Sequence, residues 1–253
     1  MRIEPGRVAL VTGGASGIGL ALAVEAASRG MRVVIADVRA DALDEASDRV
    51  AAARPDDRAA VLAINADVSR QHDVELVAEA AFRVGPVQLV CSNAGIVPSG
   101  RAWELPAGDW DRVMAVNFTA TVHLMRASLP RLIEAGQPAQ LLVTGSMASV
   151  TARAGISPYV AAKHALLGLC ETVNQELAED GADVRVTLLL PGKVATGMSR
   201  ADYPDAISPA EAARIAFAAV GRRQPVAFTH ADRIPEVERR FAAIVDGGRQ
   251  GAG

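Results

Sequence analysis

The sequence predicts an α/β fold, a doubly wound parallel sheet flanked by helices and contained in a single domain. Short apolar runs rich in β-branched residues alternate along the chain with longer segments of helical pattern. No linker long enough to divide domains interrupts this alternation. Such a pattern is typical of parallel strands that are joined by crossover helices. A chain of 253 residues is long enough to bury a sizeable core in one domain of this kind.

The elements follow from the apolar runs and from the helix start and stop signals. Buried strands are expected at 7–11, 32–36, 61–64, 87–91, 141–143 and 184–190, with 224–229 as the last strand. Helices are expected from residue 20 and near 40–53, 69–84, 109–135, 157–180 and 208–220. A further helix is expected over 236–245, ended by Gly247 and Gly248.

Composition and charge exclude several classes of function. The chain is 50% hydrophobic and 22% charged, with a formal net charge of −3, so it offers no basic field for nucleic acid. Residues 1–6 lack the apolar core of a signal peptide, and no apolar run reaches the length of a membrane span. Cys91 and Cys170 lie in a predicted strand and a predicted helix without CxxC spacing. They are interpreted as reduced core residues of a cytoplasmic protein. The four histidines show no metal-ligand spacing.

A glycine-rich turn follows the first predicted strand. The turn is Thr12-Gly13-Gly14-Ala15-Ser16-Gly17-Ile18-Gly19, and it leads directly into a helix. Glycines at such a turn let backbone N–H groups approach a pyrophosphate at the helix N-terminus. The next strand ends in Asp37, eighteen residues after Gly19, where a carboxylate would bind adenosine ribose hydroxyls. The pattern predicts a Rossmann-type dinucleotide site, although a tight turn without ligand would share the glycines.

Tyr159 and Lys163 form the most informative pair in the chain. They are four residues apart, so they share one face of the predicted 157–180 helix. An ammonium beside a phenol favours the phenolate and lowers the phenol's pKa from about 10. Ser157 as N-cap and Pro158 as first helical residue would place Tyr159 at the positive end of the helix. Ser146 ends a strand thirteen residues earlier, close enough to face the same cleft. An exposed Tyr-Lys pair is the alternative, but only two of the 26 basic residues are lysines.

Together these residues resemble the short-chain dehydrogenase/reductase superfamily over about residues 6–220. Six motifs carry the resemblance in order: Thr12–Gly19 (TGxxxGxG), Asp67-Val68, Asn93-Ala94-Gly95, Asn117, Ser146 with Tyr159 and Lys163, and Pro191–Thr196 (PGxVxT). The catalytic residues implied are Asn117, Ser146, Tyr159 and Lys163. The cofactor-binding residues implied are Gly13, Ser16, Gly17, Ile18, Gly19, Asp37, Asp67, Val68, Asn93, Ala94, Gly95, Tyr159, Lys163, Pro191, Gly192, Val194 and Thr196. No metal is expected.

The resemblance implies hydride transfer between NAD(H) and an alcohol or ketone, with residues 1–253 as one dinucleotide-binding and catalytic domain. Tyr159 would exchange the proton, Lys163 would lower the phenol's pKa and hold the nicotinamide ribose, and Ser146 would orient the substrate oxygen. Asn117 would hold a water that connects Lys163 to solvent. Two alternatives remain: an NADP(H)-dependent biosynthetic ketone reductase, to which Arg39 points, and a non-catalytic NAD(H)-binding sensor or scaffold.

The sequence also bears on the substrate and on the assembly. The expected walls of the substrate site, at 96–105, 147–156 and 193–203, mix apolar residues with Arg101 and Arg153, which favours a mainly apolar alcohol or ketone. Residues from about 193 to 253 form a variable substrate and oligomer segment. Family members commonly end in a strand followed by Asp-Gly-Gly, whereas here Asp246-Gly247-Gly248 follows a predicted helix. A homodimer through the 109–135 and 157–180 helices is therefore favoured over a homotetramer.

Overall fold

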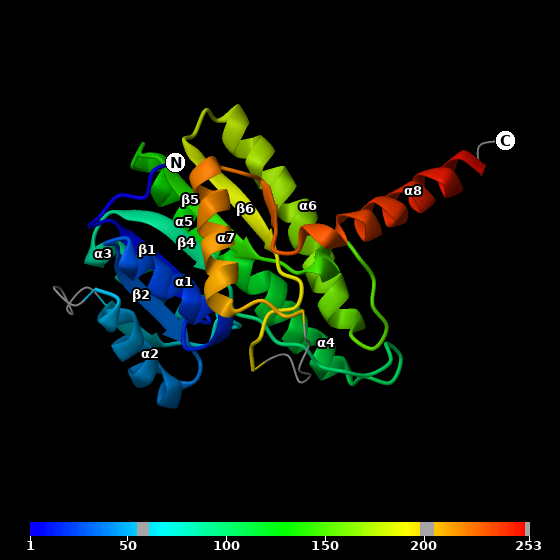
Figure 1. Cartoon of the computed structure of the whole chain (residues 1–253). Helices are drawn as coiled ribbons and strands as arrows, with labels where there is room; N and C mark the ends of the chain where they lie inside the picture. Colours follow the sequence, from blue (N-terminus) through cyan, green and yellow to red (C-terminus); the bar gives the residue numbers. More distant parts are fainter. Residues whose placement is uncertain (55–60, 198–204, 251–253) are drawn as a thin grey trace.

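The computed structural model describes residues 1–54, 61–197 and 205–250 (Figure 1). Seven strands form one parallel sheet in the order β3-β2-β1-β4-β5-β6-β7. The strands are β1 (Val8–Thr12), β2 (Arg32–Asp37), β3 (Val61–Asn65), β4 (Val87–Ser92), β5 (Ala139–Thr144), β6 (Val184–Leu190) and β7 (Val226–Phe228). The predicted doubly wound parallel sheet is confirmed. The winding reverses between β1 and β4, so their carboxyl ends meet at the crevice where such sheets bind ligands.

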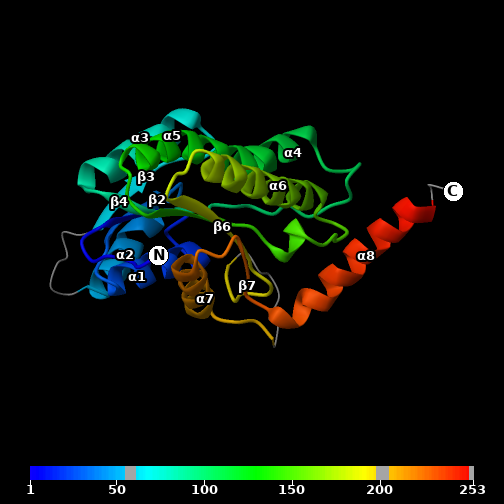
Figure 2. The ribbon, with the colours of Figure 1, turned by 90° about the horizontal axis from the view of Figure 1, so that it is seen from above.

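Helices cover both faces of the sheet (Figure 2). One face carries α1 (Gly17–Ser28), α2 (Ala40–Ala52) and α7 (Pro209–Arg222). The other carries α3 (Gln71–Val84), α4 (Ala107–Met114), α5 (Ala120–Glu134) and α6 (Ser157–Glu179). Each set of helices forms a separate apolar core with the sheet face that it covers.

The alternation of side chains along β1 shows why both faces are covered. Val8 and Leu10 pack in one core, whereas Ala9 and Val11 pack in the other. All four are fully buried, and burying a Val or Leu side chain contributes about 1.5–3 kcal/mol. A strand that is apolar on both sides requires a helix layer on each side. Strands buried in this way have the near-continuous apolar runs that are seen in the sequence.

The predicted helix over 109–135 is divided in the structure. A π-helical turn, η2 (Ala115–Thr119), separates α4 from α5. Such a turn inserts an extra residue into the helix and turns the side chains that follow it. Asn117 lies in this turn, and its amide bonds to both backbone groups of Ile96. The prediction of one regular helix was wrong because a tertiary contact, which helical periodicity does not report, determines the local geometry.

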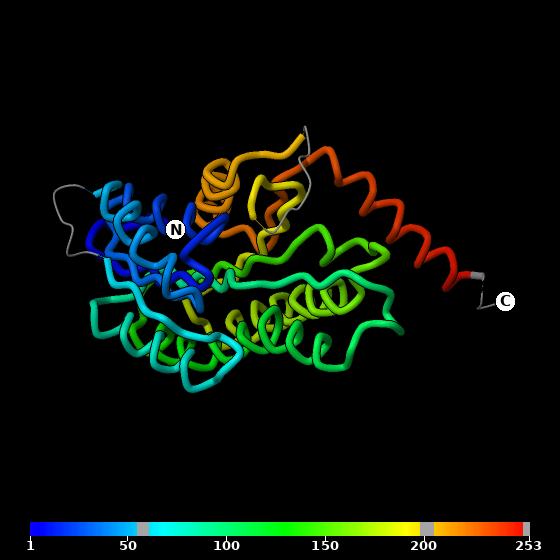
Figure 3. Tube along the Cα trace, turned by 90° about the horizontal axis from the view of Figure 1, so that it is seen from below, coloured from blue at the N-terminus to red at the C-terminus, as the bar shows by residue number. Residues whose placement is uncertain are grey.

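The last helix, α8 (Ile234–Gln250), projects away from the rest of the molecule (Figures 1 and 3). Its first turns touch the body, since Val237 packs against a core and Arg240 Nη1 donates to the Val150 carbonyl at 3.0 Å. The helix continues through Gly247 and Gly248, so the prediction that these glycines end it was wrong. Glycine costs about 1 kcal/mol inside a helix but does not forbid it. A positive φ, which would mark a glycine cap, is found at other glycines of the described chain.

Within the described ranges, no helix is long and apolar enough to cross a membrane. Among the same residues, no group of three or more His, Cys, Asp or Glu side chains could hold a metal ion.

Candidate active site

The glycine turn leaves the start of α1 open at the carboxyl end of β1. Gly13 and Gly17 have φ angles of +65° and +55°, which favour glycine. A Cβ on Gly19 would lie 2.0 Å from the Gly13 carbonyl oxygen, so that position has no room for a side chain. The Ser16 hydroxyl accepts from Arg39 at 2.8 Å and does not cap α1. In the described chain, the first turn of α1 carries no acidic side chain. The open, positive helix end fits a pyrophosphate.

Asp37 lies beside this turn at the end of β2 and is 8% exposed. One carboxylate oxygen accepts from the Ala15 N–H at 3.1 Å, and the other accepts from the Arg39 N–H at 3.1 Å. Each oxygen therefore retains a lone pair for a ribose hydroxyl. The Arg39 guanidinium lies 3.5 Å from the same carboxylate and also bonds Ser16, so it partly neutralises the site. This contact bears directly on the choice between NAD and NADP.

Asn93 connects three strand ends. Its amide nitrogen donates to the carbonyls of Thr12 and Gly13 at 3.1 and 3.3 Å, and its oxygen accepts from the Thr144 hydroxyl at 3.1 Å. A Cβ on Gly13 would lie 2.8 Å from Cα of Ala94. Asn93 and Ala94 thus hold the glycine turn against the ends of β1, β4 and β5.

Asp67 and Val68 follow β3 at the same edge of the sheet. The Asp67 carboxylate accepts from the backbone N–H and the hydroxyl of Ser69 at 3.0 and 2.7 Å. The bond with the Ser69 hydroxyl is the main cause that holds the pKa of Asp67 below its usual value. Val68 is 9% exposed and packs in a core. Asp67 and Val68, which are expected to bind the cofactor, therefore lie in a fixed turn.

Asn117 is buried, and its position explains the glycine at 95. Its Oδ1 accepts from the Ile96 N–H at 2.9 Å, and its Nδ2 donates to the Ile96 carbonyl at 2.8 Å. A Cβ on Gly95 would lie 2.8 Å from this Oδ1 and 3.9 Å from Lys163 Nζ. The Asn117 side chain therefore holds the 93–96 segment in place, and Gly95 in that segment lies next to Lys163.

Ser146, Tyr159 and Lys163 come together at the carboxyl ends of β5 and β6. Ser146 starts a short 3₁₀ turn, η3 (Met147–Ser149), and its hydroxyl accepts from the Ala148 N–H at 3.1 Å. Ser146 also shares a hydrogen bond with Tyr159. Helix α6 begins at Ser157, with Ile156 in the cap position, one residue earlier than predicted. Tyr159 still lies in the first turn, as the predicted effect of the helix dipole requires.

Lys163 is 3% exposed, and its Nζ donates to the Thr144 carbonyl at 2.7 Å. The Nζ lies 5.6 Å from the centroid of the Tyr159 ring. Burial lowers the pKa of Lys163 to about 8. Burial also raises the pKa of Tyr159 above its ordinary value, an effect that the hydrogen bond with Ser146 partly offsets. In the protein alone, desolvation therefore outweighs the predicted lowering of the phenol's pKa by Lys163.

The segment 191–196 links this group to the glycine turn. The Pro191 carbonyl accepts from the Met147 N–H at 2.9 Å, next to Ser146. At its other end, Thr196 Cγ2 would lie 3.2 Å from a Cβ on Gly17. Val194 between them is buried and pairs with Ile207. The segment therefore spans the site from the predicted catalytic serine to the start of α1.

Two polar residues that neighbour the predicted site residues in the sequence also have contacts in the structure. Lys193 forms an ion pair with Asp205 at 2.8 Å. His164 Nδ1 contacts the Val160 carbonyl of its own helix at 2.9 Å.

The expected substrate walls meet in part. Gly100 pairs with Ile156, and its N–H donates to the Gly155 carbonyl at 2.9 Å, which joins the walls 96–105 and 147–156. Arg101 lies 5.7 Å from the Trp103 ring centroid, and Trp103 is 78% exposed. Residues 198–203 of the third expected wall, Tyr203 included, lie outside the described residues.

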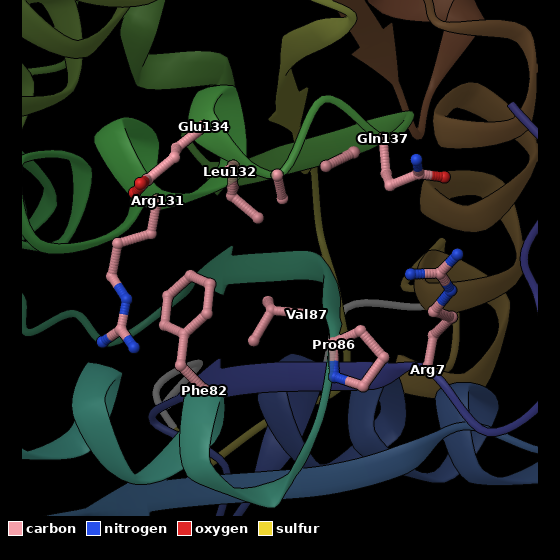
Figure 4. Close-up of a pocket in the computed structure, with 10 residues that line it drawn as sticks. Arg7, Phe82, Pro86, Val87, Arg131, Leu132, Glu134 and Gln137 are labelled. Atoms are coloured by element: carbon pink, nitrogen blue, oxygen red, sulfur yellow. The ribbon is translucent and has the colours of Figure 1, made fainter.

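A different hollow lies at the opposite, amino edge of the sheet (Figure 4). Arg7 borders it on one side, and Arg131 stacks 4.0 Å from the Phe82 ring centroid on the other. It contains none of the predicted site residues and is not part of this site.

Sequence reasoning missed Thr144, Thr229 and His230. Thr144 supplies the carbonyl that holds Lys163, and Thr229 accepts from the Gly192 N–H at 2.9 Å. The available signal was position alone, because each threonine lies at the carboxyl end of a parallel strand.

Comparison with known proteins identifies the family. The model of the short chain dehydrogenase family matches residues 7–206. The chain is 39% identical over 242 residues to the 1-deoxy-11-beta-hydroxypentalenate dehydrogenase of Streptomyces avermitilis, covering 92% of this chain and 87% of that protein. It is 32% identical over 201 residues to the D-beta-hydroxybutyrate dehydrogenase of Rhizobium meliloti, covering 79% of this chain and 76% of that protein.

A solved structure shows the same fold over nearly the whole length. The short chain dehydrogenase/reductase from Burkholderia phymatum, determined in complex with NAD, superposes with a TM-score of 0.89 at 30% identity and covers 96% of both chains. The chain therefore belongs to the short-chain dehydrogenase/reductase family, and it is an oxidoreductase that acts on CH–OH groups.

Proposed function

We propose that this protein is an NAD(H)-dependent dehydrogenase that interconverts a secondary alcohol and a ketone on a mainly apolar small molecule. The observation that carries the proposal is the placement of Ser146, Tyr159 and Lys163 at one end of the 191–196 segment, with the open start of α1 at its other end. A hydride acceptor bound by the glycine turn would thus lie beside a proton acceptor.

Each residue has one task in this mechanism. In the oxidative direction, the Tyr159 phenolate takes the hydroxyl proton of the alcohol, and it returns that proton in reduction. The Ser146 hydroxyl donates to the substrate oxygen, orients it and stabilises the charge that develops there. Bound NAD(H) supplies or accepts the hydride, so that the alcohol loses one hydride and one proton to become a ketone.

Lys163 sets the proton balance. Because burial raises the pKa of Tyr159, the phenolate needs positive charge nearby. The Lys163 ammonium supports it from the same helix face and would also donate to the nicotinamide ribose. Asn117 and Gly95 fix the backbone next to Lys163. Asn117 would, in addition, lie close enough to hold the water that connects Lys163 to solvent.

NAD is proposed over NADP because of Asp37. Its carboxylate would accept from both ribose hydroxyls and repel a 2′-phosphate. Two like charges about 4 Å apart cost about 4 kcal/mol at an effective dielectric constant of 20. The specific observation in favour of NADP is Arg39, whose guanidinium contacts Asp37 and Ser16 and could meet a phosphate. The other cofactor contacts proposed are the backbone of Gly13–Gly19, Asp67-Val68, Asn93–Gly95 and Pro191–Thr196.

The substrate class is proposed from the walls and from the relatives. Both dehydrogenases named above act on hydroxy acids by their names. The first two walls carry Arg101 and Arg153 among apolar residues. An apolar secondary alcohol that bears a carboxylate fits both observations.

Assembly as a dimer or larger is proposed through the α4–α5 segment and α6, and light scattering at micromolar concentration tests it. A monomeric mass would contradict it.

The two cysteines are free and buried, which supports a reducing, cytoplasmic compartment.

The function is tested by reduction of NAD⁺ with a panel of secondary alcohols, with and without a carboxylate. We expect turnover with at least one of these alcohols, and we expect Tyr159→Phe to lower that turnover by about 10²–10⁴-fold. Binding of NADH without turnover on any alcohol or ketone of the panel would instead support the sensor or scaffold alternative.

A further inference from the structure

The start of the C-terminal segment reaches back to the nicotinamide side of the proposed site. The Gly192 N–H donates to the Thr229 hydroxyl at 2.9 Å, directly after β7. That hydroxyl lies 2.7 Å from His230 Nδ1. Thr229 is 9% exposed, so little solvent is available to replace either contact. A hydroxyl that accepts from a backbone N–H can use its own proton for the imidazole, which makes His230 Nδ1 the acceptor.

The His230 ring also packs against Gly192. A Cβ on Gly192 would lie 2.5 Å from His230 Nδ1 and 2.8 Å from its Cγ. Both the ring and the absence of a side chain at 192 are therefore needed for this contact. The second ring nitrogen, Nε2, is buried, and no described group bonds to it. An unpaired buried nitrogen costs free energy of folding. If the ring served only for packing, an apolar side chain would therefore be more stable at this position. The Nδ1 contact explains why a histidine fits here.

The segment that these residues hold leads to both ends of the site. Pro191, next to Gly192, accepts from the Met147 N–H and is thereby tied to Ser146. Thr196 at the far end lies next to Gly17 in the glycine turn, since a Cβ on Gly17 would be 3.2 Å from Thr196 Cγ2. A shift at Gly192 would therefore move the wall of the nicotinamide site relative to the predicted catalytic serine.

We propose that Thr229 and His230 are positioning residues that fix the Pro191–Thr196 segment for cofactor binding. The inference rests on the proposed function. It gives the residues directly after β7 a role in the site, although none of the six motifs includes them. Neither side chain needs to touch the cofactor, since both act through Gly192.

The first experiment replaces the hydroxyl at nearly constant shape. Thr229→Val should raise the NADH dissociation constant and the KM for NAD⁺ about tenfold, equivalent to 1.4 kcal/mol, with a smaller change in kcat. Thr229→Ser, which keeps the hydroxyl, should stay within about twofold of wild type. Thr187→Val is the matched control. Thr187 lies in the neighbouring strand β6, is also buried, and its hydroxyl donates to the Gln224 carbonyl at 2.6 Å.

The Thr187→Val control separates an effect on cofactor binding from an effect on protein stability. Both valine variants should lower the melting temperature, but only Thr229→Val should weaken NADH binding by the folded protein. If Thr229→Val lowers the melting temperature and leaves NADH affinity and KM at wild-type values, the proposal is overturned. If the wild type neither binds NADH nor reduces NAD⁺, the proposed function fails, and this inference fails with it.

The second experiment tests the packing of the ring. Gly192→Ala should weaken NADH binding at least tenfold because its methyl group meets the His230 ring. Adding His230→Ala should restore a large part of the affinity by removing that ring. His230→Asn, whose carbonyl can replace Nδ1 as acceptor, should bind NADH more tightly than His230→Phe. A double variant no better than Gly192→Ala, or Asn and Phe variants that bind alike, would contradict the assigned contacts.

Discussion

The carboxyl edge of β1, β4 and β5 and the C-terminal helix α8 are opposite extremes of the same chain. At the strand edge, the side chain of Asn93 joins the Thr12 and Gly13 carbonyls to the Thr144 hydroxyl. On α8, Phe241, Ile244 and Val245 are 43%, 56% and 50% exposed. The first region is fixed by buried polar contacts that leave few alternative geometries. The second has apolar side chains with few neighbours in the described chain, so its position depends on much weaker constraints.

This contrast indicates which part of the molecule can hold reacting groups. A proton transfer needs groups held in a fixed geometry, and the strand edge provides that geometry through Thr144 and Lys163. Thr229 and His230 lie between the two regions, since α8 begins at Ile234 and then leaves the body.

The largest effect is expected at Tyr159. Tyr159→Phe keeps the ring but removes the proposed proton acceptor, so alcohol oxidation should fall by about 10²–10⁴-fold. NADH binding and the melting temperature should stay close to wild type, which fluorescence titration and thermal unfolding would show. Lys163→Arg should also be strongly impaired, because a planar guanidinium does not fit the position of a compact ammonium.

The catalytic assignment is wrong if Tyr159→Phe retains more than about a tenth of wild-type turnover. The turnover number must be compared on protein that is shown to be folded and to bind NADH.

The predictability of the site follows the same division of the molecule. The glycine turn, Asp37 and the Tyr159–Lys163 pair lie in short local patterns whose geometry the backbone determines. Their positions could therefore be predicted, and the structure brings them to one edge of the sheet. The direction of the Tyr159 pKa could not be predicted, because desolvation depends on burial that only the assembled fold defines.

Contacts between distant segments explain the other differences. The Asn117 turn is shaped by Ile96, twenty-one residues earlier, and Gly192 meets Thr229, thirty-seven residues later. Neither contact leaves a periodic signal in the sequence. The continuation of α8 through Gly247 and Gly248 was missed for the opposite reason. The two glycines are a strong local signal for the end of a helix, but the helix does not end there.

The second prediction concerns Asp37. The wild type should prefer NAD⁺ over NADP⁺ by at least tenfold in kcat/KM, about 1.4 kcal/mol. Asp37→Ala should remove that preference, because the repelling charge is lost and Arg39 remains to meet a phosphate. Arg39→Ala is the matched control and should increase the preference for NAD⁺. Equal turnover of both cofactors by the wild type would overturn the NAD assignment.

The third prediction uses the buried ammonium of Lys163. Its pKa is about 8 in the folded protein and about 10.4 in an unfolded chain. The unfolded state therefore binds more protons between these values, and Lys163 should make the protein more stable as pH rises from about 8 to 10. The effect is isolated as the difference in unfolding free energy between wild type and Lys163→Met, because the buried Cys91 and Cys170 thiols act in the opposite direction above about pH 9.

That difference should shift in favour of the wild type by on the order of 1 kcal/mol or more across the interval. Urea unfolding of both proteins at about pH 7.5, about pH 9 and about pH 10 would measure it. A difference that does not change with pH would mean that Lys163 is not desolvated in the folded protein.

The smallest effect is expected on α8. Truncation after Arg240 keeps Val237 in the core and the bond of Arg240 to the Val150 carbonyl, and it removes Phe241, Ile244 and Val245. Because these side chains are about half exposed, their loss should change the melting temperature little, and kcat/KM should stay within about twofold of wild type. Arg240→Ala in the full chain is the informative partner variant, since it breaks the hydrogen bond between α8 and the 147–156 wall. It should raise the KM for substrate more than the truncation does. A truncation that lowers stability or turnover by tenfold would show that the exposed part of α8 is as closely coupled to the site as the strand edge is.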